Sequence, residues 1–362
     1  MNAYSTKLAE AFSATIIQVF FETSPIPEIT NDNYEGEIRD KATLLNIPTI
    51  SGATLKNYTG ADMTADDLTE SVGQLSTDQQ KAYYFKVKSL DKLKSFIKNP
   101  EGNMLDQLKG LLEESIASYV LGLYGDVAAG NRHGTNHADG TVGVTATTGA
   151  VAGSSTNFTA AMVGRGFKAT GHSAWYRVKT YTNSTTIVIE DDSDDLTSAY
   201  SGGTISGGTA YVIEAVTAIQ VTKSNIYAFI LGLATKLNGR KIPKSNRWLV
   251  LPSAVADLLR QAPEYIPAVA KAYEDTVQNG LIYRVGGVMI YESEQVSGDS
   301  VNGWHILMGH KSAIVFGMAM TETEIEMQLI GNFGKAYKGL SVYGAKVVDE
   351  RRKALAEGFW KL

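Results

Sequence analysis

The chain has 362 residues, 44% of them hydrophobic and 20% charged, so it can form two or three globular domains with buried cores. Its net charge of -5 argues against a basic, nucleic-acid-binding surface over the whole molecule. The absence of cysteine excludes disulfides, thiolate nucleophiles and thiolate metal ligands. There is no signal-peptide pattern, and no apolar run approaches the ~20 residues of a membrane span, so we expect a soluble protein.

Residues 1–33 are predicted to form an extended N-terminal arm. An amphipathic segment, Leu8–Phe21, precedes two closely spaced prolines, Pro25 and Pro27. Because proline lacks a backbone N–H and fixes its own φ, we expect neither a helix nor a central strand there. The arm is expected to lie across another surface instead of forming its own core.

Residues 34–90 are predicted to form a long β-hairpin with strands at 42–50 and 81–88. Pro48 places the first strand at an edge, because proline cannot donate to a ladder of strand hydrogen bonds. Between the strands lies a polar, acidic stretch in which Thr64–Asp67 resembles the capping box of a short helix.

The second hairpin strand alternates in character along its length. Tyr83, Phe85 and Val87 share one face, which is the period of two that a strand produces. A strand of nine residues is ~30 Å long. An arm of this length cannot bury both faces on a small domain of its own, so we expect it to contact a neighbouring chain.

Residues 104–124 form the clearest predicted helix. Apolar residues recur at helical spacing, with charged residues between them, and Asn99–Pro100 and Asn103 precede the segment as stop and start signals. The apolar positions are Leu105, Leu108, Leu112, Ile116, Tyr119 and Leu123.

Residues 135–216 differ in composition from the remainder of the chain. Leucine nearly vanishes, and Gly, Ser, Thr and Ala dominate. Short strand-like runs at 174–181, 185–189 and 210–215 are separated by turn signals. Strands of this length and spacing predict a small all-β barrel or sandwich, inserted into a loop of the host fold.

Residues 217–362 return to a mixed α/β pattern. Two helices are expected, at 224–237 and from Ser253 onward, the first of them ended by Asn238–Gly239. A turn or helix is expected at 311–313, and a charged stretch closes the chain. The strand-like segments are 247–251, 283–291, 304–308, 321–330 and 338–348.

Candidate ligand groups are few. His133 and His137 have a spacing that suits two metal ligands on a helix, but a glycine lies between them, and a polar loop is the favoured interpretation. The aspartates of 191–195 lack the EF-hand pattern and favour a solvated turn over a calcium site. Residues 164–171 resemble a phosphate-binding loop but lack its Gly-Lys-Ser/Thr ending, which favours strand and turn glycines.

No catalytic constellation is evident in the sequence, and no cofactor or metal is expected. Trp175, Tyr176 and Tyr181 could stack on sugars or bases, although aromatic residues of small β domains more often belong to the core.

The order of an arm, a projecting hairpin, a long helix, an α/β body and a late return strand resembles that of the major capsid proteins of tailed phages, which have the HK97-type fold. The resemblance covers everything except 135–216. The segments that carry it are 247–253, 286–293, 308–316 and 338–348.

The resemblance implies an α+β, HK97-like capsid fold with an inserted small all-β domain. By this resemblance the parts of the chain are an N-terminal arm (1–33), an extended β-hairpin loop (34–90), a peripheral domain with its spine helix (91–134), the inserted all-β domain (135–216), a continuation of the peripheral domain (217–245), an axial domain (246–320), and the peripheral return strands with the C-terminus (321–362).

The function implied is that of a non-enzymatic major capsid protein. It would assemble in the host cytoplasm into pentamers and hexamers of an icosahedral virion shell that encloses double-stranded DNA without sequence-specific binding. Scaffolding and portal proteins are the expected partners, and no membrane is involved. Lys56 is the positional candidate for a cross-link that some members form, although a plain surface lysine is favoured. The candidate inter-subunit contacts are Tyr83, Phe85, Val87, Lys56, Ile47, Pro25 and Pro27.

One alternative stays open. A tail or decoration component of a phage, with the 135–216 module binding glycans, would also account for the inserted β domain.

Overall fold

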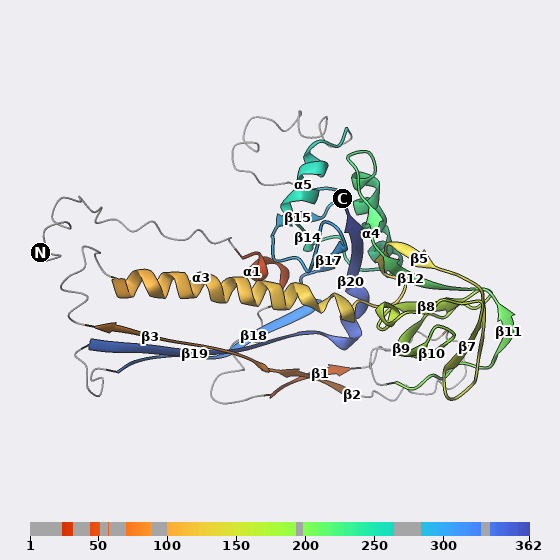
Figure 1. Cartoon of the computed structure of the whole chain (residues 1–362), viewed down its shortest axis with the longest axis horizontal. Helices are drawn as coiled ribbons and strands as arrows, with labels where there is room; N and C mark the ends of the chain where they lie inside the picture. Colours follow the sequence, from red (N-terminus) through yellow and green to blue (C-terminus); the bar gives the residue numbers. More distant parts are fainter. Residues whose placement is uncertain are drawn as a thin grey trace, which may run out of the picture.

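The computed structural model describes residues 24–31, 44–50, 57, 70–88, 100–192, 198–263, 284–326 and 334–362. The described elements form an elongated molecule in three parts (Figure 1). A long helix and a narrow three-stranded sheet lie side by side at one end, a seven-stranded sheet with two helices forms the middle, and an eight-stranded sheet forms the other end. No helix among these residues has the length and apolar character needed to cross a membrane.

The long helix is α3 (Pro100–Leu121), which continues into a 3-10 turn at Gly122–Asp126. Proline at the first helical position costs no hydrogen bond, because N–H groups of the first turn have no partner within a helix. The C-terminal half of α3 enters the main core through Ile116, Val120 and Leu121. The helix predicted at 104–124 is confirmed, with its start four residues earlier.

The narrow sheet has the strand order β18–β19–β3 and runs beside α3 (Figure 1). Its strands are β18 (Ile314–Glu326), β19 (Gly334–Val347) and β3 (Gln79–Lys88). The predicted strand at 338–348 is therefore confirmed, and the one at 321–330 is a strand as far as Glu326, where the described residues end.

The pairing predicted for the hairpin is wrong. β1 (Leu44–Ile50) pairs with β2 (Glu70–Ser76), whereas β3 pairs with β19 over ten residues. β2 was missed because its sequence, ESVGQLS, is short, polar and interrupted by Gly73. The ladder with β19 brings Phe85 opposite Tyr337, an aromatic pair that a local hairpin does not offer β3. The capping box predicted at Thr64–Asp67 lies outside the described residues.

The two prolines of the arm do not exclude a helix, which corrects a second expectation. α1 (Ile26–Ile29) begins directly after Pro25, and Pro27 lies in its first turn, where a missing N–H costs nothing. Ile26 and Ile29 enter the main core, which fastens this short helix to the body. The amphipathic segment Leu8–Phe21 lies outside the described residues.

The seven-stranded sheet forms the body. Its main path is β13 (Ile219–Gln220), β20 (Leu355–Lys361), β17 (Gly303–His310), β14 (Arg247–Leu251) and β15 (Met289–Glu292). β4 (Arg132–His133) also pairs with β20, and β16 (Gly298–Asp299) with β17. The strand predicted at 247–251 and the helix α5 (Ser253–Arg260) are confirmed, and residues 311–313 form a turn.

Two boundaries in the body differ from the sequence prediction. α4 (Ile226–Gly239) ends at Gly239, as Asn238–Gly239 predicted, but it begins at Ile226, two residues later than expected. The strand expected at 283–291 begins only at Met289. Gly286 and Gly287 adopt φ of 58° and 85°, a turn conformation that no extended strand contains.

β20 was not predicted, yet it lies inside the body sheet between β13 and β17. Its sequence, LAEGFWK, is almost wholly buried although it contains Glu357 and Gly358, and these two residues disguise the apolar pattern of a strand. The grouping of 321–362 into one unit therefore joins strands of different sheets, since β18 and β19 belong to the narrow sheet.

The chain leaves the body after β4 and returns to it at β13, and the residues between them form the eight-stranded sheet. The strand order of this sheet is β11–β6–β7–β10–β9–β8–β12–β5. The three predicted strands are confirmed as β9, β10 and β12. A separate core that includes Phe158, Phe167 and Tyr211 stabilises it. The strands are β5 (Thr135–His137), β6 (Thr141–Val144), β7 (Ala150–Ser154), β8 (Gly166–Ala169), β9 (Tyr176–Asn183), β10 (Thr186–Asp191), β11 (Ile205–Thr209) and β12 (Tyr211–Thr217).

Candidate functional site

The predicted contact face of β3 lies toward α3. Tyr83 pairs with Gly339 of β19, and its ring occupies the space where a side chain on that glycine would sit. Phe85 stacks on Tyr337 with a centroid distance of 5.0 Å. Tyr83, Phe85 and Val87 are half-buried, so the chain itself covers part of this face.

The opposite face of β3 is more open than the predicted one. Tyr84 is 55% exposed, and Lys86 lies 5.3 Å from its ring centroid. The alternating pattern of β3 identified both faces, but only the structure shows that α3 covers one of them and leaves Tyr84 free.

A groove follows the line between α3 and β3. It consists of two adjoining cavities of about 290 Å³ and about 460 Å³, which share Lys81, Leu111 and Ser115. The smaller cavity is apolar, and the larger one, toward Tyr119, is polar. Leu111 at the shared boundary is 53% exposed. The apolar side chains of the smaller cavity are Ala82, Tyr83, Leu105, Leu108, Leu111 and Leu112. We call this feature the α3–β3 groove.

The α3–β3 groove leaves apolar side chains partly in water. Leu111, which lines both cavities, is among the exposed large hydrophobic residues of the described chain. Full burial of one such side chain contributes about 1.5–3 kcal/mol. A groove lined by Leu111 and other apolar side chains therefore suits an apolar polypeptide segment, and Leu111 was not a candidate contact residue from the sequence.

The other predicted contact residues lie in different surroundings. Pro25 is buried, whereas Pro27 is exposed at the surface of α1. Ile47 is 5% exposed and packs in a small core with Leu75, Val315 and Val348, so the chain itself covers its side chain. Lys56 lies outside the described residues.

A buried ion cluster is the strongest electrostatic feature of the molecule. Glu357 of β20 has no solvent exposure. Its carboxylate accepts hydrogen bonds from Arg132 Nε at 2.8 Å, Arg165 Nη1 at 2.8 Å and His305 Nδ1 at 2.7 Å. Burial would raise the pKa of Glu357, but the hydrogen bond from His305 and the charges of Arg165 and Arg132 outweigh it and lower the pKa to about 2. Glu357 is therefore ionised.

Two further carboxylates hold the linker that leads from α3 into the eight-stranded sheet. Glu214 of β12 accepts the backbone N–H of Gly130 at 2.8 Å. Asp192 accepts the backbone N–H of Ala129 at 2.7 Å and a hydrogen bond from Arg352 Nη2 at 2.9 Å. Burial raises the pKa of Glu214, and the Arg132 charge and the Gly130 hydrogen bond only partly oppose this effect.

The ion cluster joins two separate parts of the fold. Arg165, Glu214 and Asp192 belong to the eight-stranded sheet and its loops, whereas Glu357 and His305 belong to β20 and β17 of the body. Removing one member of a buried pair costs several kcal/mol, so the cluster holds the two parts in one relative position. The sequence analysis missed it because its members are far apart in sequence.

The residues considered as metal ligands have structural roles instead. His133 and His137 lie on β4 and β5, which corrects the polar-loop interpretation. Trp360 Nε1 donates to His133 Nδ1 at 3.0 Å. Asp192 is buried in an ion pair with Arg352, not placed in a solvated turn. In the part of the chain that the structure describes, no group of three or more His, Asp or Glu side chains could hold a metal ion.

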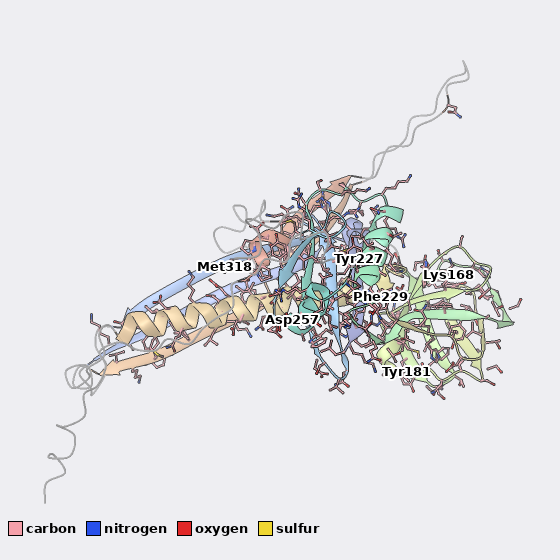
Figure 2. All side chains as sticks on the ribbon, turned by 90° about the horizontal axis from the view of Figure 1, so that it is seen from above. Lys168, Tyr181, Tyr227, Phe229, Asp257 and Met318 are labelled. Atoms are coloured by element: carbon pink, nitrogen blue, oxygen red, sulfur yellow. The ribbon has the colours of Figure 1, made fainter. Side chains whose placement is uncertain are left out.

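The aromatic residues singled out in the β module do not gather into one platform. Tyr176 packs against Tyr200 beside the core, Trp175 lies 5.5 Å below the Lys168 ammonium, and Tyr181 is 37% exposed. Lys168 and Tyr181 are far apart in this module, at the end of the molecule away from the narrow sheet (Figure 2). Gly164 and Gly171, at the ends of the presumed phosphate loop, flank β8 with positive φ, which confirms the strand-and-turn interpretation.

Comparison with known proteins gives a match in structure only. No protein-family model matches the sequence, and no curated protein matches it. The chain is similar to a solved chain of Mycobacterium phage Che8, with 16% identity, a TM-score of 0.60, and 98% of each chain covered. It is similar to the Cyanophage Pam1 capsid asymmetric unit, with 10% identity, a TM-score of 0.59, and 99% of this chain and 98% of that chain covered.

A third similar structure is the mature capsid of bacteriophage PhiM1, with 12% identity, a TM-score of 0.57, and 97% of this chain and 91% of that chain covered. These likenesses extend over nearly the whole length of each chain. The chain therefore has the fold of phage capsid chains, which confirms the predicted fold class.

Proposed function

We propose that this chain is a major capsid protein that assembles with copies of itself into the shell of a tailed phage. The observation that carries the proposal is the full-length likeness to capsid chains of several phages. These matches span 97% or more of this chain. The proposed role is structural and includes no catalytic step.

The α3–β3 groove supports the proposal on physical grounds. An isolated subunit with Leu111 more than half exposed in this groove keeps apolar surface in water, and contact with a second copy removes that surface. By its resemblance to capsid proteins, a neighbouring copy covers this part of the molecule with the portion of its 34–90 region that precedes β3, because β3 pairs with β19 of its own chain. Tyr83, Phe85 and Val87 are proposed as contact residues beside the groove.

The finer features of the proposal follow from the resemblance. The shell is icosahedral, with pentamers and hexamers of this chain around double-stranded DNA, and scaffolding and portal proteins take part in its assembly. The net charge of -5 suits a container that holds DNA without binding it tightly. The protein is then a virion component that assembles in the host cytoplasm.

Electron microscopy of the purified full-length protein tests the proposal. Closed particles or ring-shaped capsomers are the expected result. Protein that stays monomeric at high concentration, both alone and with a co-expressed candidate scaffolding protein, would refute it.

The alternative of a tail or decoration component with a glycan-binding module is not favoured by the comparisons, which find capsid structures. A glycan array probed with the full-length chain separates the two functions. Specific glycan binding by a protein that forms tubes or trimers, but no shells, would support the alternative.

A further inference from the structure

A small cavity lies at the seam between the eight-stranded sheet and the body, and neither the assembly proposal nor the ion cluster accounts for it. Its volume is about 310 Å³, at the lower limit of small-molecule sites. The body contributes Tyr124, His305 and Phe359 to its wall, and the sheet side contributes Val163 and Arg165. We call it the seam cavity.

The guanidinium of Arg165 offers unused donors to the seam cavity. Its side chain is 9% exposed and is anchored to Glu357 through Nη1 alone. Nε and Nη2 have no hydrogen-bond partner among the described residues. Neither atom is fully enclosed by the protein, so a ligand can reach them. The Nε–Nη2 edge is therefore a rigid, partly desolvated pair of donors, the geometry that binds a planar carboxylate at two points.

His305 presents a second polar atom beside this edge. Its Nδ1 donates to ionised Glu357, so the hydrogen-bonding capacity of Nε2 remains available. The imidazole is held between two parallel rings, Tyr124 at 3.9 Å and Phe359 at 4.3 Å between centroids. This sandwich leaves the ring no freedom to turn Nε2 away, and it makes two walls of the seam cavity aromatic.

The charges around the seam cavity favour an anion. The guanidinium groups of Arg132 and Arg177 both donate to the carbonyl oxygen of Gly125 in the cavity wall, and Arg165 lies in the same wall. Glu357 pairs with Arg132 and Arg165, and Glu214 lies 3.6 Å from Arg132, so three guanidinium groups face two carboxylates. Burial and the neighbouring charges of Arg352 and Arg132 lower the pKa of Arg177, which is the effect expected where cations are crowded.

We propose that the seam cavity binds a small carboxylate with an apolar or aromatic body. The carboxylate pairs with the free edge of Arg165, and the body lies against Tyr124, Phe359 and the alanine and valine side chains near the mouth. Phosphate suits the site less well, because its larger hydration shell has no polar replacement at these apolar walls. Carboxylate binding in the seam cavity does not depend on shell assembly. The binding proposal and the capsid proposal can therefore be refuted independently of each other.

Ligand-observed NMR with the full-length chain tests the site, with benzoate as the probe. Benzoate is expected to show saturable binding, on the order of 1 mM, and its neutral counterpart benzamide to bind at least about tenfold more weakly. Inorganic phosphate is expected not to displace benzoate at equal concentration. Equal binding of benzoate and benzamide, or displacement by phosphate, would overturn the proposal.

Two variants locate the binding. Val163→Glu places a carboxylate at the mouth of the cavity, where the side chain is 45% exposed, and is expected to abolish benzoate binding. Val301→Glu makes the same change at a turn that is 77% exposed and outside the cavity, and is expected to leave binding intact. Arg165→Lys keeps the charge beside Glu357 but lacks the two-point edge, so binding weakens about tenfold. If Arg165→Lys does not fold, the two valine variants still show whether benzoate binds in the seam cavity, because both valine side chains face water.

A second pair of probes identifies the source of the carboxylate. N-acetyl-glycyl-phenylalanine carries a C-terminal carboxylate, and its amide does not. Tighter binding of the peptide acid than of benzoate assigns the site to a polypeptide C-terminus, and weaker binding assigns it to a free small carboxylate. Binding of the amide as tight as that of the acid would contradict both.

Discussion

At the scale of single residues, Glu357 shows how one charge can be stable in a buried strand. Three donors from separate segments, on Arg132, Arg165 and His305, surround its carboxylate within 2.8 Å. An unpaired carboxylate without solvent exposure would instead become neutral or unfold the strand. The stabilising effect depends on the complete set of donors, so the loss of Glu357 leaves all three without their acceptor.

Glu357→Gln should lower the free energy of unfolding by about 3–5 kcal/mol, because it leaves two guanidinium groups buried without their counter-charge. Denaturant unfolding followed by circular dichroism measures the change. Glu113→Gln is the matched control, since Glu113 is 43% exposed and forms only a surface pair with Lys109. The control should change stability by less than about 1 kcal/mol, and an equal loss in both variants would contradict the role given to the cluster.

The stabilisation by Glu357 should depend on pH in a defined direction. Its pKa in the folded state, about 2, lies below the ordinary value of 4.5, so its contribution is present above pH 4.5 and is lost as the pH falls toward 2. The difference in unfolding free energy between the wild type and Glu357→Gln should therefore be constant near neutral pH and shrink below pH 4.5. A difference that grows on acidification would show that this carboxylate is not held ionised.

At the scale of elements, the pairing of α3 with the narrow sheet creates both a core and an open surface. The C-terminal half of α3 enters the main core, and Tyr343 of β19 bonds Ser115 at 3.1 Å. The earlier half of the helix lies over β3 without filling the space between them, and this produces the α3–β3 groove. The same helix thus supports the subunit at one end and forms the proposed contact surface at the other.

Leu111→Glu should reduce shell assembly strongly while leaving the subunit folded. Leu111 is 53% exposed, so a charge there costs the isolated chain at most about 0.5 kcal/mol, but it must be desolvated in any contact at the groove. Sedimentation velocity and electron microscopy measure the assembled fraction. Val301→Glu, at 77% exposure on the β16–β17 turn, is the control and should assemble normally. Normal shells from the Leu111 variant would exclude the groove as a contact between copies.

At the scale of the whole molecule, two hydrophobic cores are joined through polar groups. The main core includes residues of α3, α4 and the body sheet, and the second core lies inside the eight-stranded sheet. Arg132 lies between them, because it bonds Glu357 of the body and the carbonyl oxygen of Gly164 on the sheet side. Hydrogen bonds and ion pairs are directional, so this seam sets an orientation that apolar contact alone would leave loose.

Arg132→Met should loosen the seam without unfolding either core. Amide hydrogen exchange at residues 125–132 and 163–166 is expected to accelerate. The carbonyl oxygens of Gly125 and Gly164 and the carboxylate of Glu214 lose the guanidinium that holds them. Amides next to Val178 and Ile187, inside the second core, should keep their protection. Uniform acceleration throughout the eight-stranded sheet would mean that the sheet depends on the seam for its own stability.

The sequence by itself determined the elements whose signals are local. The apolar spacing of α3, the continuous apolar run of β14 and the β-rich composition of 135–216 can each be recognised within one stretch of the chain. The order of these elements also indicated the fold class, because proteins that share a fold have the same order of elements even where their individual residues differ.

Only the tertiary structure decided which strands pair and which charges meet. β3 joins β19, more than 240 residues away, instead of the nearby β1, because the longer ladder buries Phe85 against Tyr337. β20 is a central strand although it contains Glu357, because partners from β4, β17 and the turn before β8 neutralise that charge. Such partners are separated by up to 225 residues, and no local pattern in the sequence records their meeting.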